Sequence, residues 1–286
     1  MSTVVYEIVD VFTDRAFAGN PLAVVFGAEA LTGGQMQAMA REFNLSETAF
    51  VLPPTDPAAT YRVRIFTPAT ELPFAGHPSL GAAVTQQRRG LFEPGPVVQE
   101  CLAGLLPVTV AGDGTGVLTG GTPTAGPERD PGSLLAGLGL TVDDHLGPAP
   151  SAASCGMPFV FLRVRPGAVA RARLVDPAAI DDLCLLAWDP PSRTAQVRVF
   201  APGAGVAEDP ATGSAALALG AWCVFTGLLP GDGTATFLVH QGAEVGRPSI
   251  LCGSVTASDG RPVSTTVSGQ VVPIATGIMQ IPSDDG

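Results

Sequence analysis

Residues 64–68 read RIFTP and residues 198–202 read RVFAP, so the motif RxFxP occurs twice, 134 residues apart. Each copy ends a strand-like run and leads, through a loop rich in Gly, Pro and acidic residues, into an alanine-rich segment. The strand-like runs are 61–66 and 195–200, and the alanine-rich segments are 78–89 and 213–226. A period of 134 residues is far too long for a solenoid, so the pattern predicts duplication of a whole α+β domain.

Both alanine-rich segments carry the sequence signals of helix ends. Pro78 suits the first helical position, Thr212 suits an N-cap, and Gly90 and Gly227 suit the positions just after a helix C-terminus. The second segment is apolar all round from residue 215 to 225, which is typical of a helix enclosed by a curved sheet.

The sequence on either side of the repeated motif also corresponds between the halves. Strands are predicted at 4–12, 23–26 and 158–164, helical sequence at 34–43 and partly at 168–183, and short β segments at 97–118 and 234–281. The Gly/Pro-rich stretch 120–132 is the predicted linker. We therefore expect an N-terminal half at 1–122 and a C-terminal half at 123–286, with the last strand able to cross back to the first half.

Composition excludes several functional classes. The chain has 286 residues and a net charge of −11, and its 15 basic residues are all arginine. Without lysine it can form neither a Schiff base nor a P-loop phosphate site. The acidic balance argues against nucleic-acid and anionic-membrane partners. No apolar run is long enough to span a bilayer and no signal peptide is visible, so a cytoplasmic protein is expected.

The cysteine and histidine residues give no metal-site pattern. The five cysteines are scattered and form no CxxC pair, and only three histidines are present. We therefore expect no metal site and reduced thiols. A duplicated fold instead predicts a cleft between the halves, into which two helix N-termini would point. Helix N-termini carry unsatisfied N–H groups and partial positive charge, so the expected ligand is a small-molecule carboxylate.

Three segments carry the residues that suit catalysis: NLSETAF at 44–50, PFAGHPS at 73–79 and EDPATGS at 208–214. With GNPLAV at 19–24 and GAEVGRPS at 242–249, they resemble the phenazine-biosynthesis PhzF-like isomerases, relatives of diaminopimelate epimerase. The resemblance implies two pseudo-symmetric halves, each a curved β-sheet or barrel around a central helix, with the active site between them. It also implies a reaction without a cofactor, and a homodimer.

By the same resemblance, Glu47 is the general base and acid, and His77 and Asp209 are its catalytic companions. The residues themselves leave alternatives open. Glu47 also suits an exposed helix-to-strand turn, His77 suits a cap of its local turn, and Asp209 suits a carboxylate that caps the following helix. The expected substrate-binding residues are Ser46, Gly76, Thr212, Gly213 and Ser214.

Several further residues narrow the chemistry. The related racemases use one cysteine thiol at each helix start, but here the matching loops read AGH at 75–77 and PAT at 210–212. Racemisation by two thiol bases is therefore disfavoured, and one carboxylic acid that returns its proton to the same face of the substrate fits better.

Arg64 and Arg198 are expected at the rim or surface, because side chains alternate along a strand. Glu208 is expected to be structural.

The resemblance implies a proton and double-bond shift in a small unsaturated cyclic amino acid similar to trans-2,3-dihydro-3-hydroxyanthranilate. Leu217 and Ala218 stand where the phenazine enzyme has Gly-Pro, which leaves the substrate open. Alternatives are the double-bond shift of a pyrroline precursor in another antibiotic pathway, and epimerisation of an amino acid. A different class is a small-molecule binding protein that has lost the chemistry.

Overall fold

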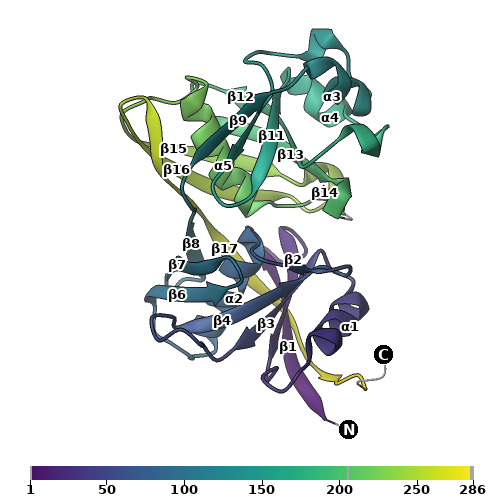
Figure 1. The fold of residues 1–286 in the computed structure, drawn as a ribbon, viewed down its shortest axis with the longest axis vertical. Coiled ribbons are helices and arrows are strands. Elements are labelled where there is room, and N and C mark those ends of the chain that lie inside the picture. Colours follow the sequence, from purple (N-terminus) through teal and green to yellow (C-terminus); the bar gives the residue numbers. More distant parts are fainter. Residues whose placement is uncertain (1, 205, 284–286) are drawn as a thin grey trace. The chain divides into compact units, whose positions relative to one another are not determined.

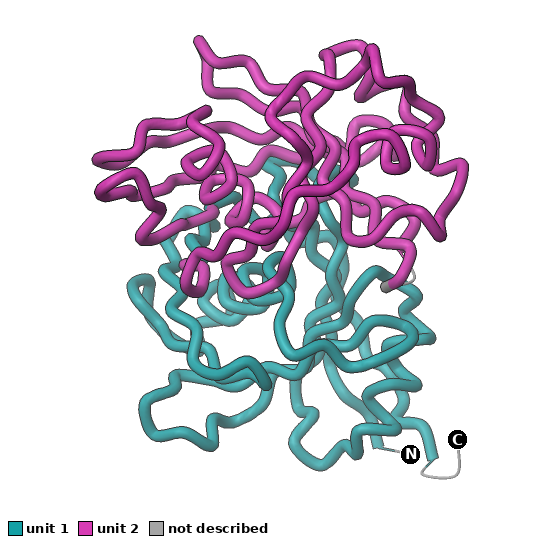
Figure 2. Tube along the Cα trace, turned by 45° about the horizontal axis from the view of Figure 1, so that its top comes forward, with its two compact units in different colours: residues 1–118, 268–286 teal, residues 119–267 magenta. Residues whose placement is uncertain are grey.

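The computed structural model describes residues 2–204 and 206–283 (Figure 1). The chain divides into two compact units, one made of residues 1–118 and 268–286 and the other of residues 119–267 (Figure 2). The boundary expected from the sequence lies after residue 122. The structure places it after Leu118 and assigns the C-terminal stretch to the first unit, because that stretch pairs with the N-terminal strand.

In the first unit, eight strands pair in a closed cycle and form a barrel. Its elements are β1 (Thr3–Val11), β2 (Asn20–Phe26), α1 (Gly33–Phe43), β3 (Glu47–Leu52), β4 (Tyr61–Phe66), β5 (Glu71–Leu72), α2 (Gly76–Arg88), β6 (Gly95–Cys101), β7 (Gly104–Val110), β8 (Thr115–Thr119) and the later part of β17 (Arg261–Gln280). The cycle runs β1-β2-β3-β4-β6-β7-β8-β17 and back to β1, with the pairs β2–β3 and β4–β6 parallel.

Helix α2 is the central helix of this barrel. It packs against β1, β2, β3, β4 and β7, and residues 76–86 are all buried. Small residues allow this close approach: a Cβ at Gly81 would lie 2.6 Å from the Leu22 side chain and 2.8 Å from that of Val11. Glycine at position 81 therefore lets the helix lie directly on β1 and β2.

The second unit repeats this strand arrangement. Its elements are β9 (Thr124–Glu128), α3 (Pro131–Gly137), η1 (Val142–Asp144), β10 (Ser151–Ser154), β11 (Pro158–Arg163), α4 (Pro166–Arg171), η2 (Pro177–Ala179), β12 (Leu183–Asp189), β13 (Thr194–Ala201), η3 (Pro202–Ala204), β14 (Val206–Asp209), α5 (Gly213–Phe225), β15 (Gly233–Gln241), η4 (Ala243–Val245), β16 (Ser249–Ser258) and the first residues of β17. The parallel pairs are β11–β12 and β13–β15, as β2–β3 and β4–β6 are in the first unit.

Helix α5 is buried along residues 213–224 and packs against β9, β10, β11 and β16. Trp222 stacks on Phe161 of β11, with ring centroids 5.4 Å apart. A second group of buried residues lies between the strands and the short helices, and includes Leu135 of α3, Val169 of α4 and Leu185 of β12. The second unit therefore buries apolar side chains both at its central helix and beneath α3 and α4.

The structure confirms the duplicated α+β fold and corrects three details. Helix α2 begins at Gly76, so Pro78 is the third helical residue and not the first. The predicted linker 120–132 contains strand β9 and the start of α3. The stretch 168–183 holds only the end of α4 and the single turn η2 before β12 begins. Gly114 has φ +86° in the turn between β7 and β8.

Candidate active site

The first unit brings Glu47 and His77 together. Glu47 is the first residue of β3, and His77 lies in the first turn of α2. The His77 Nε2 atom lies 3.5 Å from Glu47 Oε2, and the two side chains are 4% and 15% exposed. The alternative of an exposed glutamate in a turn is therefore wrong. Glu47 is a mostly buried carboxylate with an imidazole directly beside it.

His77 is held from its other side by a polar chain. The Asn20 amide nitrogen lies 3.2 Å from His77 Nδ1, and the Ser46 hydroxyl donates to Asn20 Oδ1 at 3.1 Å. Asn20 is fully buried at the start of β2. In the sequence, Asn20 is only part of the stretch 19–24, and nothing in that stretch assigns it a role. The structure shows that it connects the predicted residues Ser46 and His77.

Burial lowers the pKa of His77 to about 3, so the folded protein holds a neutral imidazole at neutral pH. A neutral histidine cannot act as a fixed positive charge in this site. It carries one N–H group, which it can donate to a carboxylate or to a substrate. Gly76, the expected companion of His77 at the helix start, is also buried.

The buried His77 predicts a pH dependence of stability. The unfolded chain takes up this proton near pH 6.5, and the folded chain takes it up near pH 3. The free energy of unfolding is therefore unaffected by this group above pH 6.5, and falls by about 1.4 kcal/mol per pH unit as the pH drops from 6 to 4. We expect this slope to be reduced in His77→Gln and retained in His240→Gln, which alters an exposed histidine. Urea unfolding at each pH measures it, and equal slopes in all three proteins would contradict it.

In the second unit, Asp209 lies at the end of β14, three residues before the N-cap of α5. The Thr212 hydroxyl donates to Asp209 Oδ2 at 2.5 Å. The sequence predicts that Thr212 caps the helix with its side chain. Thr212 does occupy the N-cap position, but its side chain makes no capping hydrogen bond. The hydroxyl orients the Asp209 carboxylate instead, because a charged acceptor binds it more strongly.

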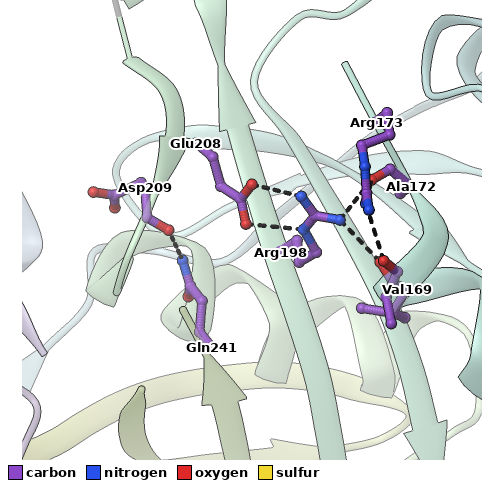
Figure 3. A network of polar contacts seen from close by, with 8 residues as sticks. Val169, Ala172, Arg173, Arg198, Glu208, Asp209 and Gln241 are labelled. Carbon is purple, nitrogen blue, oxygen red and sulfur yellow. Dashed lines mark hydrogen bonds and ion pairs between the residues drawn. The ribbon is translucent and has the colours of Figure 1, made fainter. Parts of the chain in front are cut away.

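Gln241, the last residue of β15, holds this loop from below (Figure 3). Its Nε2 donates to the Asp209 carbonyl oxygen at 2.7 Å and to Thr212 Oγ1 at 2.9 Å. Its Oε1 accepts from the Thr212 N–H at 3.2 Å. Gln241 is buried, and all three contacts go to the segment that carries Asp209. The sequence does not reveal Gln241 as a site residue, since a glutamine at a strand end has no distinctive local signature.

The Thr212 hydroxyl is predicted to matter for stability. Thr212→Val keeps the shape of the side chain but leaves the buried Gln241 amide with one acceptor fewer and Asp209 without this donor. We expect a loss of about 1–2 kcal/mol in the free energy of unfolding of the second unit. Thr212→Ser, which keeps the hydroxyl, should lose less than half of that. Denaturant titration followed by tryptophan fluorescence compares the two, and equal losses would show that the hydroxyl contributes little.

Two ion pairs occupy corresponding positions in the two units. Arg64 Nε and Nη2 donate to Glu71 at 2.7 Å each, and Arg198 makes the same double contact with Glu208. Each guanidinium lies over the phenylalanine two residues later, at 5.1 Å and 5.0 Å. Arg198 also donates to the carbonyl oxygens of residues 169 and 172, at 3.0 and 2.7 Å (Figure 3).

The rim position expected for Arg198 is wrong, because its side chain is only 6% exposed. Helix α4 and its C-cap Ala172 cover this part of β13 and provide the carbonyl acceptors, which strand alternation alone does not reveal. Arg64 is 28% exposed, so it is closer to the expected rim position. Glu208 pairs with a buried arginine, in keeping with the structural role expected for it.

Gly213 and Ser214 form the first turn of α5 and are buried. In the described part of the chain, no side-chain hydrogen bond caps the N-terminus of α5 or of α2. The first N–H groups of a helix have no partner within the helix, so both helix starts can donate to an anion.

The described residues contain no group of three His, Cys, Asp or Glu side chains that could hold a metal ion. Nor is any described helix long and apolar enough to cross a membrane.

The sequence pattern of one protein family, described as "Phenazine biosynthesis-like protein" (PhzC-PhzF), matches residues 9–277. The chain belongs to this family. It is 36% identical to an uncharacterized isomerase of Mesorhizobium japonicum, over 97% of this chain and 99% of that protein. It is 35% identical to the trans-2,3-dihydro-3-hydroxyanthranilate isomerase of Pseudomonas aeruginosa, over 95% of this chain and 98% of that protein.

Solved structures of PhzF proteins and epimerases share the fold. A PhzF-family protein of Bacillus anthracis superposes with a TM-score of 0.86 at 25% identity, covering 98% of this chain and all of that one. A predicted epimerase of Pseudomonas aeruginosa gives a TM-score of 0.82 at 34% identity, with the same coverage. A probable proline racemase from Agrobacterium radiobacter reaches 0.68 at 15% identity over 98% of this chain and 93% of that one, which shows a common fold alone.

Proposed function

We propose that this PhzC-PhzF family member is an isomerase that needs no cofactor and moves a proton within a small unsaturated cyclic amino acid. The observation that carries the proposal is the Glu47–His77 pair: a mostly buried carboxylate with a neutral imidazole 3.5 Å away, at the start of a helix. Relatives named as isomerases, 35–36% identical over nearly the whole chain, support the reaction class.

In the proposed reaction, the Glu47 carboxylate takes the proton from C3 of a substrate similar to trans-2,3-dihydro-3-hydroxyanthranilate. The electron pair of the broken C–H bond moves into the conjugated π-system. The resulting Glu47 carboxylic acid returns the same proton to C1, so the double bond shifts and no atom is gained or lost. One carboxylic acid serves as base and then as acid, which suits a residue with little access to bulk water.

The remaining predicted residues have binding roles in this proposal. The Gly76 N–H donates to the delocalised intermediate, and the single N–H of His77 turns from Glu47 to that intermediate once Glu47 has taken the proton. Asp209 positions the amino or hydroxyl group of the substrate. The α5 N-terminus, with Thr212, Gly213 and Ser214, receives the substrate carboxylate. Ser46 acts through Asn20 on His77, as the hydrogen bonds between them suggest. We further propose a cytoplasmic homodimer without nucleic-acid or membrane partners.

Epimerisation of an amino acid is the second candidate, because a predicted epimerase is 34% identical to this chain. The cysteines argue against the two-thiol form of that reaction. Cys184 and Cys223 are buried, and burial raises their pKa far above the ordinary range of a thiol. Neither they nor the other three cysteines lie in the loops before α2 and α5. An epimerase built on this chain would need carboxylate bases.

Deuterium incorporation tests the proposal. The protein is incubated in deuterated water with trans-2,3-dihydro-3-hydroxyanthranilate, a pyrroline carboxylate and a panel of proline derivatives, and each reaction is followed by NMR. The proposal expects the first compound to isomerise and to carry part of its original C3 hydrogen to C1. Exchange at Cα of a saturated amino acid without a double-bond shift would favour epimerisation. Tight binding of several compounds with no exchange would favour a binding protein.

A further inference from the structure

We propose that Asn20 is a positioning residue that holds His77 as the Nε2–H tautomer, so that the protonated Nε2 faces the Glu47 carboxylate. This inference goes beyond the proposed function in naming Asn20 and the position of one proton. It rests on the proposed function in one respect, that Glu47 is the base. The four residues involved, Asn20, Ser46, Glu47 and His77, all belong to the first unit.

The contact between His77 and Glu47 determines which ring nitrogen carries hydrogen. His77 Nε2 lies 3.5 Å from Glu47 Oε2, and a carboxylate oxygen only accepts hydrogen bonds. A bare Nε2 would set its lone pair against that oxygen, which is repulsive in a buried site. An N–H group at Nε2 makes the contact attractive, and it leaves Glu47 as the ionised carboxylate that can take a proton.

The other side of the ring then requires a donor. A neutral imidazole carries one hydrogen, so with Nε2 protonated Nδ1 is an acceptor. The Asn20 amide nitrogen lies 3.2 Å from Nδ1 and provides that donor. At 4% exposure the ring has little access to water as a substitute, so the loss of Asn20 would leave a buried acceptor unsatisfied.

Ser46 contacts the end of the Asn20 amide that lies opposite His77. Its hydroxyl donates to Asn20 Oδ1 at 3.1 Å, so the oxygen of the amide points to Ser46 and the nitrogen points to His77. Asn20 is fully buried at the start of β2, next to β3, whose first residue is Glu47. The hydrogen bonds therefore run in one direction, from Ser46 to Asn20 and from Asn20 to His77. The Nε2–H group of His77 then faces Glu47, 3.5 Å away.

The tautomer of His77 can be measured without a substrate. In protein labelled with ¹⁵N-histidine, the protonated and bare ring nitrogens have well-separated chemical shifts, and His77→Gln assigns the signal among only three histidines. We expect the wild-type protein at pH 7 to show His77 with Nε2 protonated and Nδ1 bare. Protonation of Nδ1, alone or together with Nε2, would overturn the proposal.

Asn20→Asp is the decisive variant, because it keeps the size of the side chain and replaces the donor with an acceptor. We expect Nδ1 of His77 to become protonated in this variant. A matched control is Asn44→Asp, the same change at an exposed position near the site, which should leave the wild-type signal unchanged. A bare Nδ1 in folded Asn20→Asp, or the same change in the control, would contradict the role of Asn20.

Asn20→Ala keeps the test decisive if Asn20→Asp does not fold. Without the amide donor the neutral ring loses a partner of its bare nitrogen, so we expect the pKa of His77 to rise by about one unit or more. A pKa equal to that of the wild-type protein would overturn the proposal. The ¹⁵N chemical shifts and the pKa of His77 are measured without any substrate, so they do not depend on catalytic activity. Failure of every candidate substrate would count against the proposed function and would leave the tautomer result standing.

Discussion

Glu47→Gln should lower kcat by about 10³-fold, because the amide cannot take up a proton and general acid–base catalysis typically contributes 10²–10⁴-fold. The substitution keeps the shape of a side chain that is only 15% exposed and lies 3.5 Å from His77. KM should change by less than about threefold, since the proposed role of Glu47 is in the chemical step and not in binding. The loss in kcat is measured with the substrate that the wild-type protein isomerises in the deuterated-water experiment.

The matched control is Glu42→Gln, the same change at an exposed position in α1. It should retain wild-type kcat and KM. Circular dichroism and the melting temperature show that both variants are folded. Isomerisation by folded Glu47→Gln at more than a tenth of the wild-type rate would exclude Glu47 as the base. A kcat that falls equally in the control would point to a general effect of lost negative charge.

Arg198→Met should destabilise the second unit by about 3–5 kcal/mol, the cost typical of removing one partner of a buried ion pair. The Arg198 and Glu208 side chains are 6% and 12% exposed, so the substitution leaves a largely buried carboxylate without its counter-charge. It also removes the donor that the carbonyl oxygens of residues 169 and 172 share. A loss of this size is a large part of the stability of a typical domain.

The repeat provides a matched control in Arg64→Met, the corresponding arginine of the first unit. Arg64 and Glu71 are 28% and 23% exposed, so solvent screens their pair, and we expect a loss of about 1 kcal/mol or less. Both tryptophans, Trp188 and Trp222, belong to the second unit, and both tyrosines, Tyr6 and Tyr61, belong to the first. Tryptophan and tyrosine signals therefore follow the two units separately during urea unfolding. Equal losses in the two variants would show that burial does not determine the strength of these pairs.

Much of the fold follows from the sequence, because the signals that decide it are local and occur twice. The run 61–66 is strand β4, the helix predicted from residue 34 begins at Gly33, and the apolar segment after Thr212 is the buried helix α5. Gly90 and Gly227 both have φ +73°, the left-handed conformation expected just past a helix end. Alternation and helix punctuation depend on neighbours in the chain, so they are readable without the structure.

Contacts between distant segments explain what the sequence did not reveal. Arg198 is buried because α4, some 30 residues earlier, covers it, and strand alternation carries no information about that helix. Thr212 has a side chain suited to capping, but the nearby Asp209 carboxylate competes for its hydroxyl and binds it. Asn20 meets His77 across 57 residues, and Gln241 meets Thr212 across 29. Such partners become visible only when the strands are placed side by side.

Strand β17 has a consequence for synthesis on the ribosome. The eight-stranded barrel contains both β1 and residues 268–280, which are made more than 250 residues later. The early strands therefore leave the exit tunnel with one barrel position unfilled, and β1 must wait for its partner while the whole intervening unit is translated. We expect the nascent N-terminal half to depend on chaperones until residues 268–280 have left the exit tunnel. Truncation before residue 268 should then yield a chain that aggregates, although the truncated chain still contains all the predicted site residues, from Ser46 to Ser214.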